Sequence, residues 1–433
     1  MLTEVGHGLD ARNLETTATL LPSGCFDLHS PSESAWKAMP PSTPLCGMPR
    51  VAIVFARLIV GHDDRGVKPF VVELNDSQQM CRGITSRALP VRPGTKPLDH
   101  AVTSFDHVLL PPTALLGSEA KPDDNRRDFL RQIWRVSIGT LSLSIMGVSA
   151  LRIGSRIALT YSRRRLITTG DGQQGCPFYA LVLRGGPLFE GFKTLSGSVR
   201  QALAVVFKTS VGRETKLLTE LSERCGWQGL FDYNQISELA LTFQGNSIAE
   251  GDTLVLCIRL GSELLGDKYS LPEPQDPLAP LAKHELGLIA EARQEMIDLG
   301  GYAERRSAAF NNNIVPRCRR LIEAIGERMA YEAARVRGVQ RELLHLYELL
   351  CIEEDLSWYT GSGVITRNQF FKSLVEAYKA VLPLLLQFAN NTEEAAYITA
   401  PIMSDESWSI FLQTLPSFGH NQPSSSLETS SKL

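Results

Sequence analysis

The 433-residue sequence predicts an α+β protein, in which a β domain of barrel or sandwich type precedes two bundles of α-helices. Three observations support this class. Residues 1–117 contain short runs of alternating β-branched and polar residues that are separated by turn residues. Beyond about residue 126 the apolar residues recur at helical spacing instead. Residues 271–282 are rich in proline and separate one helical block from the next.

The strands of the β domain are marked by the turns between them. The segment "LETTATLLPSGCFDLHS" breaks at Pro22, Ser23 and Gly24, which predicts a hairpin. "RVAIVFARLIV" and "KPFVVEL" predict two buried strands, and "GHDDRG" between them predicts a turn. The last strand, in "FDHVLLPPTALLG", ends at Pro111 and Pro112, because proline cannot donate to a sheet.

The helical part begins with "RDFLRQIWRVSIGTLSLSIMGVSALRIGSRIALTYSRRR", which predicts one long helix ending in an arginine cluster. A later pattern predicts a helix that begins at Glu250. In "RELLHLYELLCIEEDLSWY", helical spacing gives one apolar face, which contains Leu343, Leu346, Tyr347 and Leu350. We interpret this face as a packing face. We divide the chain into a β domain (1–117), a helical domain (118–270), a linker (271–282), a C-terminal helical domain (283–418) and a flexible tail (419–433).

The composition is that of a soluble globular protein, with 43% apolar and 21% charged residues. A net charge of −3 gives no basis for binding nucleic acid or an anionic membrane surface. The eight cysteines are scattered, without a CxxC pair or a cysteine–histidine cluster at metal-ligand spacing, so we predict no metal site. We interpret the cysteines as free thiols in a reducing compartment.

One apolar run, residues 136–154, is long enough to raise the question of a membrane span. Four serines within the run, with Arg135, Arg152 and Arg156 around it, favour a helix inside a soluble bundle. We therefore predict no membrane span.

The chain ends in Ser431, Lys432 and Leu433, after a serine-rich stretch without apolar periodicity. A terminal Ser-Lys-Leu is an address that the peroxisomal import receptor reads. The stretch before it has little apolar surface to fold around, so the tripeptide should be accessible. The sequence therefore predicts a peroxisomal protein.

Glu250, within the segment "SIAEGDTLVLCIRLGSELL", is the candidate catalytic residue. An acid at the start of a helix is stabilised by the helix dipole, by about 0.3–1 kcal/mol. Asp252 and Thr253 are also residues that cap helices. These residue preferences explain an acid at this point, but they do not explain why two acids flank Gly251. A structural role and a role as a base are both open at this stage.

Several motifs together resemble the acyl-CoA oxidase branch of the acyl-CoA dehydrogenase superfamily. "TEVGHGLDARNLETTATLLPSGCFDLHSP" resembles the flavin-side start of that family's β domain, and "FDHVLLPPTALLG" its closing strand. "RIALTYSRRR" resembles the next helix, and "AEGDTLVLCIRLGSELL" the helix with the catalytic glutamate. "LYELLCIEEDLSWYTGSGVITRNQF" resembles the extra helical domain of the oxidases. Since only Met1 and Leu2 precede the "TE" motif, the resemblance implies a truncated acyl-CoA oxidase fold without the N-terminal helical domain.

The resemblance implies roles for seven residues and FAD as the cofactor. Glu250 would take the α-proton of an acyl thioester, from an apolar cleft that raises the pKa of its carboxyl. Thr3 would contact the flavin ring and Arg165 the pyrophosphate, although Arg165 also fits a solvated helix end. Gly6 and Gly8 would allow close approach to the flavin, or simply adopt a positive φ. Gly226 and Gly229 would belong to the loop near the adenine.

This sequence departs from the family pattern at several of these motifs. The family's "KWWPG" is Lys37-Ala38-Met39-Pro40-Pro41 here, which removes an aromatic surface and a backbone donor. In the glycine-rich loop, Trp227 and Leu230 replace a glycine and an aromatic residue, and after Arg165 stand Leu166 and Ile167.

Three functions are therefore open. The first is an FAD-dependent oxidase that introduces a trans-2 double bond into an acyl thioester and reduces O₂ to H₂O₂. The second is a redox-neutral isomerase or cyclase that keeps Glu250 for proton transfer. The third is a non-catalytic subunit that pairs with a full-length oxidase. The resemblance implies a homodimer or heterodimer and acyl-CoA as the substrate.

Overall fold

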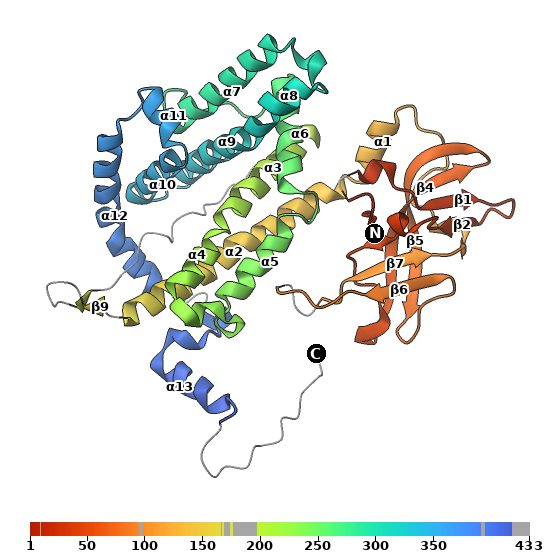
Figure 1. Ribbon diagram of the computed structural model, residues 1–433, viewed down its shortest axis with the longest axis horizontal. Helices are drawn as coiled ribbons and strands as arrows, with labels where there is room; N and C mark the ends of the chain where they lie inside the picture. The colour runs from red at the N-terminus through yellow and green to blue at the C-terminus, as the bar shows by residue number, and fades with distance from the viewer. Residues whose placement is uncertain are drawn as a thin grey trace. The chain divides into compact units, whose positions relative to one another are not determined.

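The computed structural model describes residues 1–8, 10–94, 98–165, 167–168, 174–175, 197–390 and 395–417. It divides into two compact units, Met1–Val136 and Ser137–Leu433, which are described separately below. Strands dominate the first unit and helices the second (Figure 1). The predicted α+β class is confirmed. The finer division into five segments stays a prediction.

The first unit contains two sheets. Their strands are β1 (Thr17–Leu20), β2 (Phe26–His29), β3 (Lys37–Ala38), β4 (Pro49–Val60), β5 (Asp63–Asp76), β6 (Ile84–Ala88), β7 (Ala101–Phe105) and β8 (Val108–Leu110). One sheet has the order β5-β4-β1-β2-β8, and the other has the order β3-β7-β6. Only the β1–β4 pair among these eight strands is parallel.

The two predicted turns differ in how closely they match the structure. β1 and β2 form the predicted hairpin, in which Leu20 pairs with Phe26 and Gly24 has a φ of +83°. Between β4 and β5, Val60 pairs with Asp63, so the turn is only Gly61 and His62. The charged residues that follow belong to β5, where Asp64 pairs with Arg57 of β4 at 2.5 Å.

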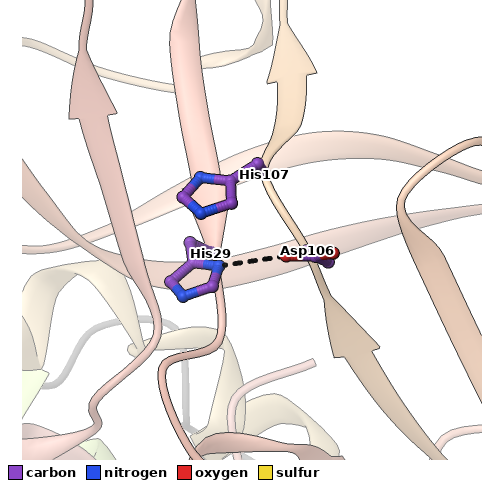
Figure 2. A group of neighbouring side chains, drawn as sticks. All are labelled: His29, Asp106 and His107. Atoms are coloured by element: carbon purple, nitrogen blue, oxygen red, sulfur yellow. Dashed lines mark ion pairs between the residues drawn. The ribbon is translucent and has the colours of Figure 1, made fainter.

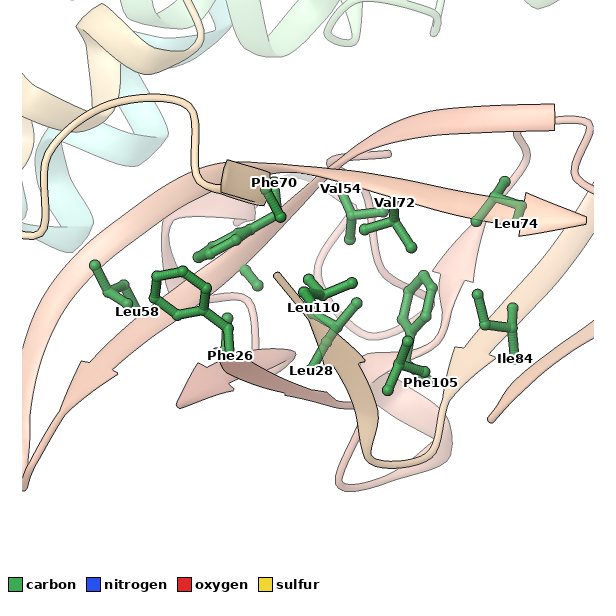
Figure 3. Packing of buried hydrophobic residues seen from close by; sticks show 14 residues of the cluster. Phe26, Leu28, Val54, Leu58, Phe70, Val72, Leu74, Ile84, Phe105 and Leu110 are labelled. Atoms are coloured by element: carbon green, nitrogen blue, oxygen red, sulfur yellow. The ribbon is translucent and has the colours of Figure 1, made fainter. Parts of the chain in front are cut away.

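Both sheets contribute to one apolar core (Figure 3). Phe26 of β2 and Phe70 of β5 meet edge to face, with ring centroids 5.2 Å apart. Phe105 of β7 and Ile84 of β6 bring the second sheet into the same core. Helix α1 (Asn125–Gln132) packs against β5 and is tied to it by Lys68 and Asp128 at 2.7 Å.

The predicted single long helix is two helices. It breaks at Ile133 and Trp134, because α1 ends on β5 of the first unit and α2 (Arg135–Arg164) continues into the second. The other helices of the second unit are α3 (Gly197–Glu214), α4 (Leu217–Arg224), α5 (Ile236–Asn246), α6 (Thr253–Leu265), α7 (Pro280–Asp298), α8 (Ala308–Asn313), α9 (Val315–Val336), α10 (Arg341–Glu354), α11 (Leu356–Gly361), α12 (Arg367–Asn390) and α13 (Asp405–Thr414). Two short strands, β9 (Ile167–Thr168) and β10 (Gln174–Gly175), pair with each other.

Helix α9 lies against α3, α6 and α7 within the second unit (Figure 1). Gly261 of α6 allows this approach, since a Cβ atom there would lie 2.9 Å from Sγ of Cys318 on α9. Leu346 and Leu350 of α10 are buried, and Leu343 and Tyr347 pack against the same cluster. The predicted packing face of α10 is confirmed.

Helix α2 is the one described helix that is long and apolar enough to cross a membrane, by length and composition. About 28% of its most apolar window is buried inside the protein. Ala150, Leu151 and Ile157 belong to a core cluster that also contains residues of α4 and α5. These residues pack inside the second unit, and the prediction that this segment does not span a membrane stays a prediction.

Candidate functional site

Glu250 lies in a turn between α5 and α6, and not on a helix. Its φ is +54° and that of Gly251 is +96°, so both residues have a left-handed backbone. Helix α6 begins only at Thr253, and the Asp252 carboxylate caps it by accepting a hydrogen bond from Val255 N at 3.1 Å. The prediction of a helix beginning at Glu250 is therefore wrong, because two successive left-handed residues cannot continue a right-handed helix. The capping role belongs to Asp252.

Side chains from three helices hold this turn. Lys208 of α3 is buried, and its ammonium donates to the carbonyl oxygens of Ala249 and Gly251. Thr140 of α2 donates its hydroxyl to the carbonyl oxygen of Glu250 at 3.3 Å. Thr253 closes the turn, since its backbone N and its Oγ1 both donate to Ser247 O, at 3.0 and 2.8 Å.

The Glu250 side chain is half-buried and lies against α2. A Cβ atom built on Gly139 would be 2.5 Å from Oε1 of Glu250 and 2.6 Å from its Cδ. Any side chain at position 139 would therefore displace the carboxylate. The carboxylate occupies space that exists because residue 139 is glycine.

Lys208 brings a buried positive charge to this turn. Burial lowers the pKa of Lys208 to about 8, while the carboxylates of Asp252 and Glu250 oppose that shift. The predicted apolar cleft around Glu250 stays a prediction, since a shallow recess between α3 and α6, lined by Val205, Leu256 and Arg259 among others, does not include Glu250.

In the first unit, the "TE" motif lies beside strand β3. Thr3 is exposed, and its carbonyl oxygen accepts from Ala38 N at 3.0 Å. The Glu4 side chain is fully buried and pairs with Lys37 at 2.9 Å, and it also accepts from the backbone N of Glu15 and Thr16. Burial raises the pKa of Glu4, but Lys37 and the hydrogen bonds outweigh this effect and lower it overall. Glu4 and Lys37 thus hold the segment that presents Thr3.

The four predicted cofactor glycines have different surroundings. A Cβ atom on Gly6 would lie 2.7 Å from Cβ of Ser34, and one on Gly229 would lie 2.0 Å from Ser222 O, so contacts within the chain require both glycines. Gly8 and Gly226 have open space at that position. Gly226 has a φ of +64°, whereas Gly6 and Gly8 do not have a positive φ, so the turn interpretation is wrong for those two.

Arg165 is exposed just beyond the end of α2, with its guanidinium 5.6 Å from the centre of the Tyr161 ring. Its neighbour Arg164 is used within the protein, because it donates to Ile402 O and pairs with Asp405. Arg165 therefore presents its cation to the surroundings. Ser431, Lys432 and Leu433 lie outside the described residues.

Sequence reasoning missed Lys208, Thr140 and Gly139. Lys208 carries a visible signal, since it is a cation inside the apolar run "ALAVVFKTSV" of α3. A buried lysine needs a partner, which indicates a function for it. Gly139 and Thr140 carry no such signal, because their importance depends on where the turn meets α2.

The first unit holds a group with the composition of a metal site, formed by His29, Asp106 and His107 (Figure 2). The two imidazole rings are stacked, with centroids 4.1 Å apart and planes at 13°. The nitrogen lone pairs lie in the ring planes, and two stacked, nearly parallel planes do not meet at the position of one ion. His107 instead binds Asp27, with 2.9 Å between Nδ1 and Oδ2. This geometry does not fit a metal site.

Comparisons with known proteins point to one family. No family model matches the chain. "Acyl-coenzyme A oxidase 3, peroxisomal" of Arabidopsis thaliana is 23% identical over 320 residues, which are 65% of this chain and 46% of the relative. "Acyl-coenzyme A oxidase acox-1.3" of Caenorhabditis elegans is 25% identical over 421 residues, which are 80% of this chain and 64% of the relative. "Peroxisomal acyl-coenzyme A oxidase 1" of Arabidopsis thaliana is 33% identical over a shorter stretch of 123 residues, 26% of this chain and 18% of the relative.

Solved structures give the same result for the fold. Acyl-CoA oxidase 1 from Yarrowia lipolytica matches 98% of this chain and 75% of its own, with a TM-score of 0.76 and 18% identity. Acyl-CoA oxidase-2 of Caenorhabditis elegans, solved with FAD, ascaroside-CoA and ATP, matches 96% of this chain and 74% of its own, with a TM-score of 0.74 and 18% identity. This chain is a relative of the acyl-CoA oxidases. The resemblance that the motifs predicted is confirmed. The match to the first relative above covers about half of that relative's length.

Proposed function

We propose that this acyl-CoA oxidase relative is itself a flavoenzyme that introduces an α,β double bond into an acyl thioester, with O₂ as the electron acceptor. The observation that carries the proposal is the position of Glu250. Its half-buried carboxylate lies in a turn held by Lys208, Thr140 and Thr253, at the point where the family resemblance expects the base.

In the proposed reaction the Glu250 carboxylate takes the proton from the α-carbon of the thioester. The Cα–Cβ double bond forms as a hydride leaves the β-carbon. Bound FAD would supply the acceptor for that hydride and the route by which two electrons reach O₂, so that H₂O₂ would form. The ammonium of Lys208 holds the backbone on either side of this carboxylate, because it donates to Ala249 O and Gly251 O.

The residues predicted to hold FAD are chemically suited to it. Thr3 and Arg165 are exposed, so a hydroxyl is available for a ring edge and a guanidinium for a pyrophosphate. Gly226 has open space where a side chain would stand. Gly6 and Gly229 would serve FAD indirectly, since contacts within the chain already require them. A solved structure of the same fold contains FAD and ascaroside-CoA.

We also propose a peroxisomal location and an oligomer. Several relatives are named peroxisomal, which agrees with an import address at Ser431, Lys432 and Leu433. The partner in the oligomer would be a second copy or a longer oxidase. Acyl-CoA is the proposed substrate, and pairing with a longer oxidase is the third function considered from the sequence.

The test is a visible spectrum of the purified protein, followed by an assay of H₂O₂ with acyl-CoA of four, eight and sixteen carbons. We expect a yellow protein, and a loss of about 10²–10⁴-fold in rate for Glu250→Gln, which keeps the shape and removes the base. A colourless protein that still exchanges the α-proton through Glu250 would favour the redox-neutral alternative. Full activity in Glu250→Gln would overturn the proposed role of the acid, and inactivity of both forms would favour a non-catalytic subunit.

A further inference from the structure

The Glu250 turn has an unusual backbone that other residues must hold in place. A non-glycine residue in the left-handed region costs about 1–2 kcal/mol relative to a right-handed one, and Glu250 adopts it directly before Gly251, which is also left-handed. Residues in such conformations persist where their surroundings over-determine them. The question is which side chains do so here.

Lys208 holds the backbone on both sides of Glu250. Its ammonium donates to Ala249 O, before the acid, and to Gly251 O, after it. The lysine comes from the middle of α3, where it is 4% exposed, so its stem is fixed by the helix packing. A single rigid donor that binds both flanking carbonyl groups fixes the direction in which the residue between them points.

Gly139 sets the position of the carboxylate itself. Oε1, Cδ and Cγ of Glu250 lie 2.5, 2.6 and 3.0 Å from the position of a Cβ atom on residue 139. The atoms in conflict are the far end of a flexible side chain, so an alanine at 139 would move the carboxylate and leave the helix intact. The next residue, Thr140, binds the carbonyl oxygen of Glu250, so α2 meets both the backbone and the side chain of the acid.

We propose that Lys208 and Gly139 are positioning residues for Glu250, one fixing the turn and the other leaving room for its carboxylate on α2. This inference rests on the proposed function, in which Glu250 is the base. A misplacement of about 1 Å from the reacting carbon can cost about 10²-fold in rate. Neither residue needs to touch the substrate to have that effect.

The first experiment measures proton abstraction without turnover to H₂O₂, because O₂ is left out. Octanoyl-CoA is incubated with the full chain in D₂O without O₂, and mass spectrometry follows deuterium entering the α-carbon. We expect Gly139→Ala to lower the rate about 10–100-fold through kcat, with KM and Tm little changed. Gly212→Ala is the matched control, because Gly212 is also on a helix and has open space at its Cβ position. It should keep the wild-type rate.

Two further readouts separate positioning from a loss of folding. In a Glu250→Asp background, whose carboxylate is one methylene shorter, Gly139→Ala should have a smaller effect, because the two closest atoms, Oε1 and Cδ of the glutamate, are absent. In Lys208→Met, amide hydrogen exchange should rise in peptides that contain residues 247–253, while Lys216→Met, at an exposed lysine, should leave it unchanged.

The outcomes distinguish the inference from the function beneath it. If Glu250→Gln exchanges the α-proton at the wild-type rate, the proposed function fails, and the inference fails with it. If Glu250→Gln is inactive but Gly139→Ala and Lys208→Met are normal, only the inference is overturned. If Gly139→Ala lowers the rate by the same factor in the wild type and in Glu250→Asp, its effect is not on the carboxylate. The proposed role of Gly139 would then be wrong.

Discussion

Glu4 and Lys37 form an ion pair in which both side chains are fully buried. Two charges taken out of water are stable only while they remain paired, because the desolvation of each is compensated by the other. The pair joins the segment that presents Thr3 to strand β3. Its stability therefore affects the part of the first unit that we propose to contact FAD.

Lys37→Met should lower the free energy of unfolding by about 3–5 kcal/mol, because it leaves the Glu4 carboxylate buried without its cation. Urea unfolding, followed by the fluorescence of the adjacent Trp36, measures this. The double variant Glu4→Gln/Lys37→Met should lose much less. Lys121→Met, at an exposed lysine of the same unit, is the control. A loss in Lys37→Met that is no larger than in the control would contradict the assigned role.

His107 should titrate above its ordinary value. The hydrogen bond to Asp27 and the charge of that carboxylate raise the pKa of His107 above 6.5. A raised pKa in the folded protein means that the contact stabilises the fold below pH 6.5 and ceases to do so as the pH rises through the folded pKa. An NMR titration of the imidazole should show the shift, and Asp27→Asn should remove most of it. Asp10→Asn should leave the titration unchanged, and an equal effect of the two variants would refute the assignment to Asp27.

At the level of single residues, sequence reasoning identified the acid but not its supports. The residue Glu250 was recognisable because a motif surrounds it, and the Asp252 cap followed from residue preference. Its left-handed backbone was not predictable, since glutamate has no preference for that region. Lys208 and Gly139 are far from Glu250 along the chain, so only the packing of α2 and α3 around the turn brings them together.

At the level of elements, helices α2 and α3 approach through a glycine. A Cβ atom on Gly147 of α2 would lie 2.4 Å from Cγ1 of Val211 on α3 and 3.1 Å from Cγ2 of Thr215. The same two helices carry Thr140 and Lys208, so this close contact helps to bring both supports to the Glu250 turn. The spacing between the helices is therefore part of the site.

Gly147→Ala should destabilise the protein by about 1–3 kcal/mol, because the added methyl group forces the helices apart. Gly212→Ala adds the same methyl group to a helix where nothing lies within 4 Å. It should be neutral or stabilise by up to about 1 kcal/mol, from helix propensity alone. Thermal unfolding of the two variants gives the comparison. Equal changes in Tm would show that α2 and α3 are not in tight contact here.

Elements were predicted well where periodicity alone decides them. The β1–β2 hairpin and the apolar face of α10 follow directly from spacing and turn residues. The division of one predicted helix into α1 and α2 did not, because no proline or glycine stands at Ile133 and Trp134. That boundary depends on α1 packing against β5, which is a tertiary effect.

At the level of the whole second unit, buried charges connect several helices. Glu327 of α9 is 1% exposed and pairs with Arg213 of α3. It also pairs with Arg320, which lies about two turns earlier on α9. Asp355, at the start of α11, pairs with His284 of α7 at 3.0 Å and lies 3.7 Å from Arg320. The set joins α3, α7, α9 and the start of α11, so it fixes how these helices pack together.

Glu327→Gln should lower the free energy of unfolding by about 3–5 kcal/mol, since Arg213 and Arg320 would lose the carboxylate that both of them bind. Chemical denaturation followed by circular dichroism measures the change. Glu353→Gln, at an exposed position of α10, removes the same charge from the chain and should change stability by less than about 0.5 kcal/mol. Similar losses in the two variants would mean that net charge, and not the buried contacts, determines the result.

The backbone at position 250 also bears on how the protein can change over time. Glycine adopts a left-handed conformation without strain, so Glu250→Gly should make the folded chain more stable while abolishing the base. Selection for robustness alone would favour that replacement. A glutamate that persists there across descendants of this chain would then be a sign that its chemistry is still in use.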